Sequence, residues 1–107
     1  MAGSQNLADY GTATSTAAAA TINHSVGLIT TESLSTAAAA EYSFTLTNAC
    51  IGASSVVLVT VQNGTNTSAG ITVCEVTPAA GSCVIKIKNT NASALNGTIL
   101  IGFLVAY

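Results

Sequence analysis

The sequence predicts an all-β protein: a single-domain antiparallel β-sandwich or jelly-roll-like barrel with an extended amino-terminal arm. Three observations lead to this fold class. Short segments alternate apolar and polar side chains, which is the pattern of strands with one buried face. Residues that favour turns separate these segments at intervals of roughly 8–15 residues, as in sandwiches and barrels. No segment carries a long apolar stripe of helical period, so the crossover helices of a parallel βαβ sheet are not expected.

Residues 1–20 are predicted to form the arm, and residues 21–107 the sandwich domain. After the first methionine, Leu7 and Tyr10 are the larger side chains of the arm. They provide little apolar surface to offset an ordering entropy of about 1–2 kcal/mol per residue. The arm is therefore expected to become ordered when a partner holds it.

The strands are predicted from the residue pattern between turn signals. Two copies of STAAAA, at 15–20 and 35–40, are too short for stable isolated helices and are interpreted as loops or strand ends. The run SVVLVTVQ at 55–62 is nearly continuous in apolar residues, which predicts a strand buried on both faces. The apolar density of the last segment indicates the centre of a sheet or a contact between subunits. The predicted strands span 21–24, 27–31, 42–47, 55–62, 71–76, 83–88 and 98–106.

The charge content is far below that of an ordinary globular domain, in which about 25% of residues are charged. The chain has 107 residues, of which 50% are hydrophobic and 6% charged, and its formal net charge is -2. Two lysines are too few for the phosphate contacts of a nucleic-acid-binding protein. The start of the chain lacks a signal-peptide pattern, and no apolar run approaches the roughly 20 residues of a membrane helix. Neither nucleic acid nor membrane is expected as a partner, and weak self-repulsion favours a subunit of an assembly over an isolated neutral domain.

The three cysteines, Cys50, Cys74 and Cys83, lack the C-x-x-C spacing of a zinc or redox site. A turn over 77–81, around Pro78, places Cys74 opposite Cys83 at close to disulfide distance if Glu75 pairs with Ser82. A bridge between these two cysteines is therefore one interpretation. The other treats all three as small buried apolar residues, and the sequence favours it because nothing indicates an oxidising compartment.

The ionisable side chains do not form a recognisable catalytic set. His24 is the one histidine, and an imidazole base needs a nucleophile and an orienting carboxylate. It is interpreted as a residue of a turn or strand end. Glu32 and Glu41 are interpreted as solvated charges at strand edges, and Lys86 and Lys88 as outward-facing residues of one strand. The sequence therefore predicts no enzyme, no cofactor and no metal site.

Four stretches carry a resemblance to a known kind of protein. They are NHSVGLITTESLST at 23–36, YSFTLTN at 42–48, SCVIKIKN at 82–89 and LNGTILIGF at 95–103. In these stretches the chain resembles the short, charge-poor β proteins encoded among the virion genes of tailed bacteriophages. Some of those proteins are capsid decoration (cement) proteins, and others are fibre or spike modules. The resemblance carries no catalytic residues.

The resemblance implies a structural virion protein on the outer surface of the capsid, where it clamps neighbouring subunits of the major capsid protein as a homotrimer. In the arm, Leu7, Asp9 and Tyr10 are then the expected capsid-binding residues. An alternative is a receptor- or glycan-binding module of a phage head or tail fibre or spike, with loops 63–70 and 89–96 as binding loops. One face of the last strand is expected to form the core or the trimer seam, through Ile99, Ile101, Phe103 and Val105.

Overall fold

The structure, a computed structural model, describes residues 10–106 of the chain. These residues form eight strands and no helix, arranged as two four-stranded sheets in a sandwich, which confirms the predicted fold class. The strands are β1 (Tyr10–Thr14), β2 (Ala19–Thr21), β3 (Val26–Thr30), β4 (Glu41–Thr47), β5 (Val56–Asn63), β6 (Ile71–Ala79), β7 (Ser82–Asn89) and β8 (Ile99–Ala106).

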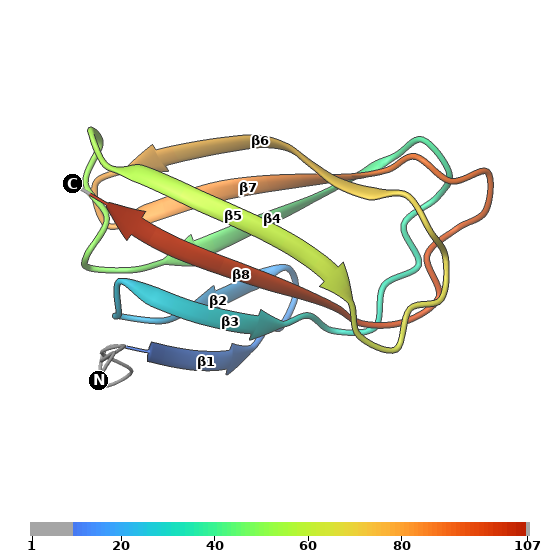
Figure 1. Ribbon diagram of the computed structural model, residues 1–107, viewed down its shortest axis with the longest axis horizontal. Helices are drawn as coiled ribbons and strands as arrows, with labels where there is room; N and C mark the ends of the chain where they lie inside the picture. The colour runs from blue at the N-terminus through green and yellow to red at the C-terminus, as the bar shows by residue number, and fades with distance from the viewer. Residues whose placement is uncertain (1–9, 107) are drawn as a thin grey trace, which may run out of the picture.

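One sheet has the strand order β1-β3-β8-β5 and the other the order β2-β4-β7-β6. In Figure 1 the two sheets form two layers, and β5 passes in front of β4. From β1 to β6 the chain changes sheet at every connection, whereas β6 and β7 follow each other within one sheet. Since a strand of the opposite sheet separates β1 from β3, and β2 from β4, these two pairs are parallel, and the remaining pairs are antiparallel.

The core lies between the sheets and is built by the predicted alternation of side chains. In β4, Tyr42, Phe44 and Leu46 point inward, and the residues between them are exposed. The inward residues of β8 are Ile99, Ile101, Phe103 and Val105, each at most 4% exposed. These four residues are core residues, so within one chain they do not form a surface seam. Branched and aromatic side chains from both sheets pack together and exclude water. This burial of apolar surface is the main favourable contribution to the free energy of folding.

The predicted arm is wrong from residue 10 onward. Strand β1 pairs in parallel with β3, and β2 pairs in parallel with β4, so residues 10–21 belong to the sandwich. Small side chains are what this packing needs: a Cβ atom on Gly11 would lie 2.5 Å from Ile22 Cγ2. The chain changes sheet between β1 and β2 through Ala17 and Ala18, which have φ angles of 52° and 63°. The sequence did not predict β1 and β2 because these strands are held by backbone hydrogen bonds to distant strands, and such pairing leaves no apolar pattern in the sequence.

The predicted arm residues fall on both sides of this boundary. Leu7 and Asp9 lie outside the described residues, and Tyr10 is the first residue of β1. The capsid-binding role of these three residues stays a prediction. The sandwich therefore begins at Tyr10 and not at residue 21.

Two further predictions of strand position and one of strand burial are wrong. The segment 21–24 is mostly a connection, because β2 ends at Thr21 and β3 begins at Val26. Strand β6 continues through Pro78, which an edge strand tolerates because its free side needs no donor. Strand β5 is buried on one face only: Val56 and Leu58 are 58% and 55% exposed. The outer face of the sheet that contains β5 is therefore apolar and accessible.

Candidate interaction surface

The outer faces of the two sheets differ in charge. On the outer face of β2-β4-β7-β6, which we call the charged face, Glu41 stands opposite Lys88 in the β4–β7 register. On the same face, Lys86 Nζ lies 3.8 Å from Glu75 Oε1. Both lysines face outward, as the sequence predicted. An exposed ion pair such as Lys86–Glu75 contributes about 0–1 kcal/mol, so the charges of this face favour solubility more than stability.

The opposite face, which we call the neutral face, is the outer surface of β3, β8 and β5. Side chains alternate along each strand, so every second residue points out of the sandwich. Within residues 10–106, no charged side chain lies on this face. The outward residues are Val26, Leu28 and Thr30 on β3, Leu100, Gly102, Leu104 and Ala106 on β8, and Val56, Leu58, Thr60 and Gln62 on β5.

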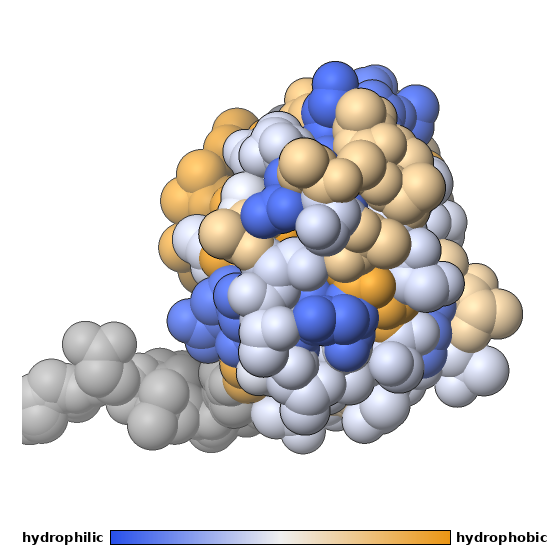
Figure 2. Space-filling model, turned by 90° about the vertical axis from the view of Figure 1, so that its right-hand side faces the viewer, coloured by the Kyte–Doolittle hydropathy of each residue, from blue (hydrophilic) through white to orange (hydrophobic). Residues whose placement is uncertain are grey.

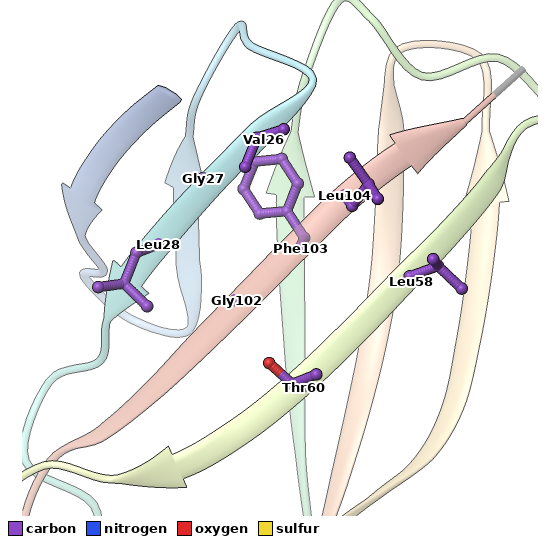
Figure 3. A pocket seen from close by; sticks show the side chains of 8 residues that line it. All are labelled: Val26, Gly27, Leu28, Leu58, Thr60, Gly102, Phe103 and Leu104. Atoms are coloured by element: carbon purple, nitrogen blue, oxygen red, sulfur yellow. The ribbon is translucent and has the colours of Figure 1, made fainter. Parts of the chain in front are cut away.

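A hollow opens in the middle of the neutral face. The register places Gly102 between Leu28 on one side and Thr60 on the other, and a glycine leaves no side chain to fill the space between them. The hollow has a volume of about 410 Å³. Figure 3 shows Leu28 and Thr60 flanking Gly102, with Leu104 and Leu58 farther along the same strands. The lining residues are Val26, Gly27, Leu28, Leu58, Thr60, Gly102, Phe103 and Leu104.

A raised row lies next to the hollow. One step along the face, Val26, Leu104 and Leu58 stand side by side in the register of the three strands. Leu58 is 55% exposed and Leu104 is 43% exposed, although both are large apolar side chains. The neutral face therefore combines a ridge and a depression, two residues apart along each strand.

The two edge strands on this side of the sandwich are protected differently. Strand β6 has a β-bulge between Val73 and Glu75 and contains Pro78, and both features discourage pairing with another chain. Strand β5 pairs with β8 in regular register over all eight of its residues. Within 56–63 it has no proline and no charge. The edge of β5 thus lacks the usual protection against pairing with a second chain.

The two loops that the fibre alternative requires lie together at one end of the sandwich, the right-hand end in Figure 1. Their polar groups bind each other. Thr67 donates its backbone N–H to Asn96 Oδ1 over 2.7 Å, and Asn96 Nδ2 donates to Thr67 Oγ1 over 2.8 Å. Asn66, which is 3% exposed, accepts from the backbone N–H of Asn96. In Figure 2, which looks onto this end, hydrophilic residues are mixed with hydrophobic ones.

Glu32 forms a polar cluster instead of the solvated charge that the sequence predicted. Its carboxylate accepts hydrogen bonds from the Ser15 hydroxyl, from the backbone N–H of Ala18 at 3.0 Å and from Tyr42. Burial acts to raise the pKa of the Glu32 carboxyl, but these hydrogen bonds and one from its own backbone outweigh it and lower that pKa. Burial likewise raises the pKa of Tyr42 to about 12, with the charge of Glu32 acting in the same direction. The cluster links the ends of β1 and β3 to β4 through hydrogen bonds, which is a structural role.

The cysteines are free thiols. The predicted hairpin register is wrong, because β6 extends through Pro78 and contains a bulge: Cys83 lies opposite Pro78, and Cys74 Sγ lies 3.4 Å from the carbonyl oxygen of Lys86. Cys83 is buried in the core, whereas Cys74 is exposed, so the two thiols do not meet. His24 lies in the connection between β2 and β3, as predicted. Cys83 alone fits the interpretation as a fully buried apolar residue.

Comparisons of the chain with models of protein families, with curated proteins and with solved structures give no match. Among residues 10–106, no group of three or more His, Cys, Asp or Glu side chains is placed to hold a metal ion. The same part of the chain contains no helix with the length and hydropathy of a membrane span.

The neutral face was not predicted from the sequence, because the apolar run of β5 indicated a strand buried on both faces. A signal for it exists in the last strand, where apolar residues occupy both faces: Leu100 and Leu104 alternate with the core residues. A chain without helices has too few elements to cover both faces of two sheets. One apolar outer face is then expected to remain open in the single chain.

Proposed function

We propose that this protein is a structural virion protein that decorates and stabilises the capsid of a tailed bacteriophage, where it clamps neighbouring major capsid protein subunits as a homotrimer. The resemblance of its strands to such proteins motivates the proposal. The observation that carries it is the division of the sandwich into one charged and one neutral outer face. Exposure of a neutral, apolar face to water is unfavourable for an isolated chain. In a subunit that is held against other subunits, burial of the same face stabilises the contact.

The mechanism is linkage between binding and assembly. A protein that binds the assembled lattice and not the separated subunits stabilises the lattice by mass action. Linking several weak contacts in one oligomer raises the effective concentration of each contact after the first has formed. The sandwich itself needs no moving part for this task, since its role is to hold fixed positions on a larger object.

The fibre or spike alternative has less support. Its predicted binding loops, 63–70 and 89–96, already bind each other: Asn66 Oδ1 accepts from the backbone N–H of Asn96, and Asn96 Nδ2 donates to Thr67 Oγ1. Groups that are already paired gain less by binding a glycan, because the existing hydrogen bonds must first be broken. These loops fit the role of a rigid end of the sandwich better than that of a recognition site.

The copy number of the protein in purified particles tests the proposal. Quantified gel bands, with the major capsid protein as an internal standard, should give hundreds of copies per particle for a decoration protein. A handful of copies would instead indicate a fibre or spike, and absence from the particles would overturn both.

A second experiment tests the arm. Removal of residues 1–9 leaves β1 complete, whereas a deletion that extends to residue 12 would remove most of that strand. The shortened protein is expected to fold and to self-associate but to bind capsids more weakly, because Leu7 and Asp9 are gone. Full capsid occupancy by the shortened protein would show that the arm is not the anchor.

A further inference from the structure

We propose that the neutral face is the surface through which copies of this chain associate, so that the outer face of β3, β8 and β5 is covered by the same face of neighbouring copies. The inference rests on the self-association in the proposed function and names its surface. It replaces the inward residues of β8, which the sequence suggested as the seam, by the outward residues of the same strand.

Charge favours a second copy as the occupant. Among residues 10–106, every charged side chain except Glu32 lies on the charged face. Two neutral faces can meet without bringing like charges together. A partner with an ordinary charged surface would have to lose the hydration of its charges against an apolar sheet that offers no counter-charge. The face that fits best is therefore another neutral one, and this chain carries such a face itself.

The shape of the face also fits a copy of itself. The raised row of Leu104 and Leu58 lies about 7 Å along the strands from the hollow at Gly102, the rise of two residues. In a closed ring whose axis runs along the strands, the raised rows of all copies lie at one level of the axis and the hollows at the next, so the leucines of neighbouring rows meet. Ridge and depression belong to the same surface, so the contact needs no second, differently shaped site on the chain.

The dimensions of the sheet favour three copies over two. Eight residues of β5 extend about 26 Å, and the whole four-stranded sheet, which includes β1 beside the neutral face, spans about 19 Å, so the outer side of the sheet covers on the order of 500 Å². A pair of faces then buries about 1,000 Å², the lower limit for a specific interface. In a ring of three copies with the strands along the axis, three sheets about 19 Å wide form the sides of a triangle. Each sheet then lies about 5.5 Å from the axis, which is close to half the spacing of about 10 Å between packed sheets. Side chains would fill such a centre.

Closure around an axis also covers the unprotected strand. In a ring of three, the edge strand β5 of one copy comes next to the opposite edge, β1, of its neighbour. Strand β5 lacks the proline and the bulge that guard β6, and an unguarded edge is a site at which another chain pairs. The arrangement thus accounts for both the uncharged face and the unguarded edge.

The test compares the full chain with lysine substitutions on each face. Leu58→Lys and Leu104→Lys place a charge on the neutral face at positions that are already exposed in the single chain. Thr45→Lys is the matched control, because Thr45 is an exposed residue on the outer face of β4. Native mass spectrometry and light scattering give the mass, and circular dichroism reports folding. Leu58→Ser, which adds no charge, serves as a milder variant should a lysine variant not fold.

We expect wild-type protein and Thr45→Lys to be oligomers, trimers above all, and each neutral-face variant to associate at least tenfold more weakly while remaining folded. Undiminished association of the folded Leu58 and Leu104 variants would overturn the assignment of the surface and leave the proposed function intact. A wild-type protein that stays monomeric at high concentration would overturn the inference. Whether that monomer binds particles then decides the decoration function separately.

Discussion

The hydroxyl group of Tyr42 donates to the carboxylate of Glu32 and lies 3.1 Å from each of its oxygens. Tyr42 is on β4 and Glu32 follows β3, so the contact joins the two sheets at their margin. The Ser15 hydroxyl and the backbone N–H of Ala18, in the connection between β1 and β2, donate to the same carboxylate. A single anion thereby holds the amino-terminal strands to the body of the sandwich, and its protonation state is coupled to stability.

Glu32→Gln is expected to lower the free energy of unfolding by about 1.5–3 kcal/mol at pH 7, the range for hydrogen bonds to a charged group. The folded pKa of Glu32 is lowered from 4.5, so its contribution is complete above that value and is lost as the pH falls through the folded pKa. The difference between wild type and variant should therefore shrink below about pH 4. Denaturant unfolding at pH 7, 5 and 3 measures it. A difference that does not change with pH would rule out the ionised carboxylate as the cause.

Tyr42 is expected to ionise at a higher pH than an ordinary tyrosine side chain. Burial raises its pKa to about 12, above an ordinary value of 10.0, so its contribution to stability is complete below pH 10 and is lost as the pH rises through 12. Absorbance at alkaline pH should show one late-titrating phenol in the wild type. Tyr42→Phe should remove that phase and lower stability by about 1 kcal/mol through the lost hydrogen bond. Persistence of the late phase in the variant would assign it to another tyrosine.

Gly27→Ala is expected to destabilise the protein by about 1–3 kcal/mol, the usual cost of overpacking a core. A Cβ atom on Gly27 would lie 2.6 Å from Phe103 Cε1 and 3.0 Å from the carbonyl oxygen of Gly11. The ring and the backbone of β1 cannot both move away. Gly52→Ala is the control, because the nearest atom there, Ser55 Oγ, is 3.7 Å away. Equal denaturation midpoints for the two variants would contradict the close packing of β1, β3 and β8.

The three thiols are expected to react in the order Cys74, Cys50, Cys83. Cys74 is exposed, Cys50 is half-buried and Cys83 is buried, and burial also raises the pKa of the Cys83 thiol, which lowers its thiolate fraction. A time course of alkylation followed by intact mass measures the order. Denatured protein without reductant should take up three alkyl groups. An uptake of only one would mean that two cysteines are joined after all.

The inward faces of the strands could be predicted from the sequence, and the partners of the strands could not. Alternation over 42–47 identifies Phe44 and Leu46 as core residues because side-chain direction in a strand depends only on local backbone geometry. The pairing of β1 with β3 depends on backbone hydrogen bonds between residues far apart in sequence, and small residues such as Gly11 leave no apolar signal for it. The predicted register of the β6–β7 hairpin was wrong because the sequence gives no signal for the bulge near Cys74.

The candidate surface was beyond sequence prediction for a related reason. An apolar run such as 55–62 indicates that both faces of a strand favour burial away from water. It does not indicate which element, or which second chain, covers each face. Leu58 is 55% exposed, with no element among residues 10–106 over it. The hollow at Gly102 depends on the neighbours of that glycine on β3 and β5. The role of Glu32 was missed because its hydrogen-bond donors come from distant segments of the chain.

The position of β8 has a consequence for how the protein is made. This strand is the last of the eight along the chain, yet it stands in the middle of its sheet and separates β3 from β5. On the ribosome, β3 has only β1 beside it, and β5 has no neighbour in its sheet, until β8 has left the exit tunnel. Before β8 is available, the sheet that contains β3 and β5 is incomplete and its leucines and valines are exposed. Strand β8 then inserts between β3 and β5 as the last step. A brief dependence on chaperones during translation is the expected result.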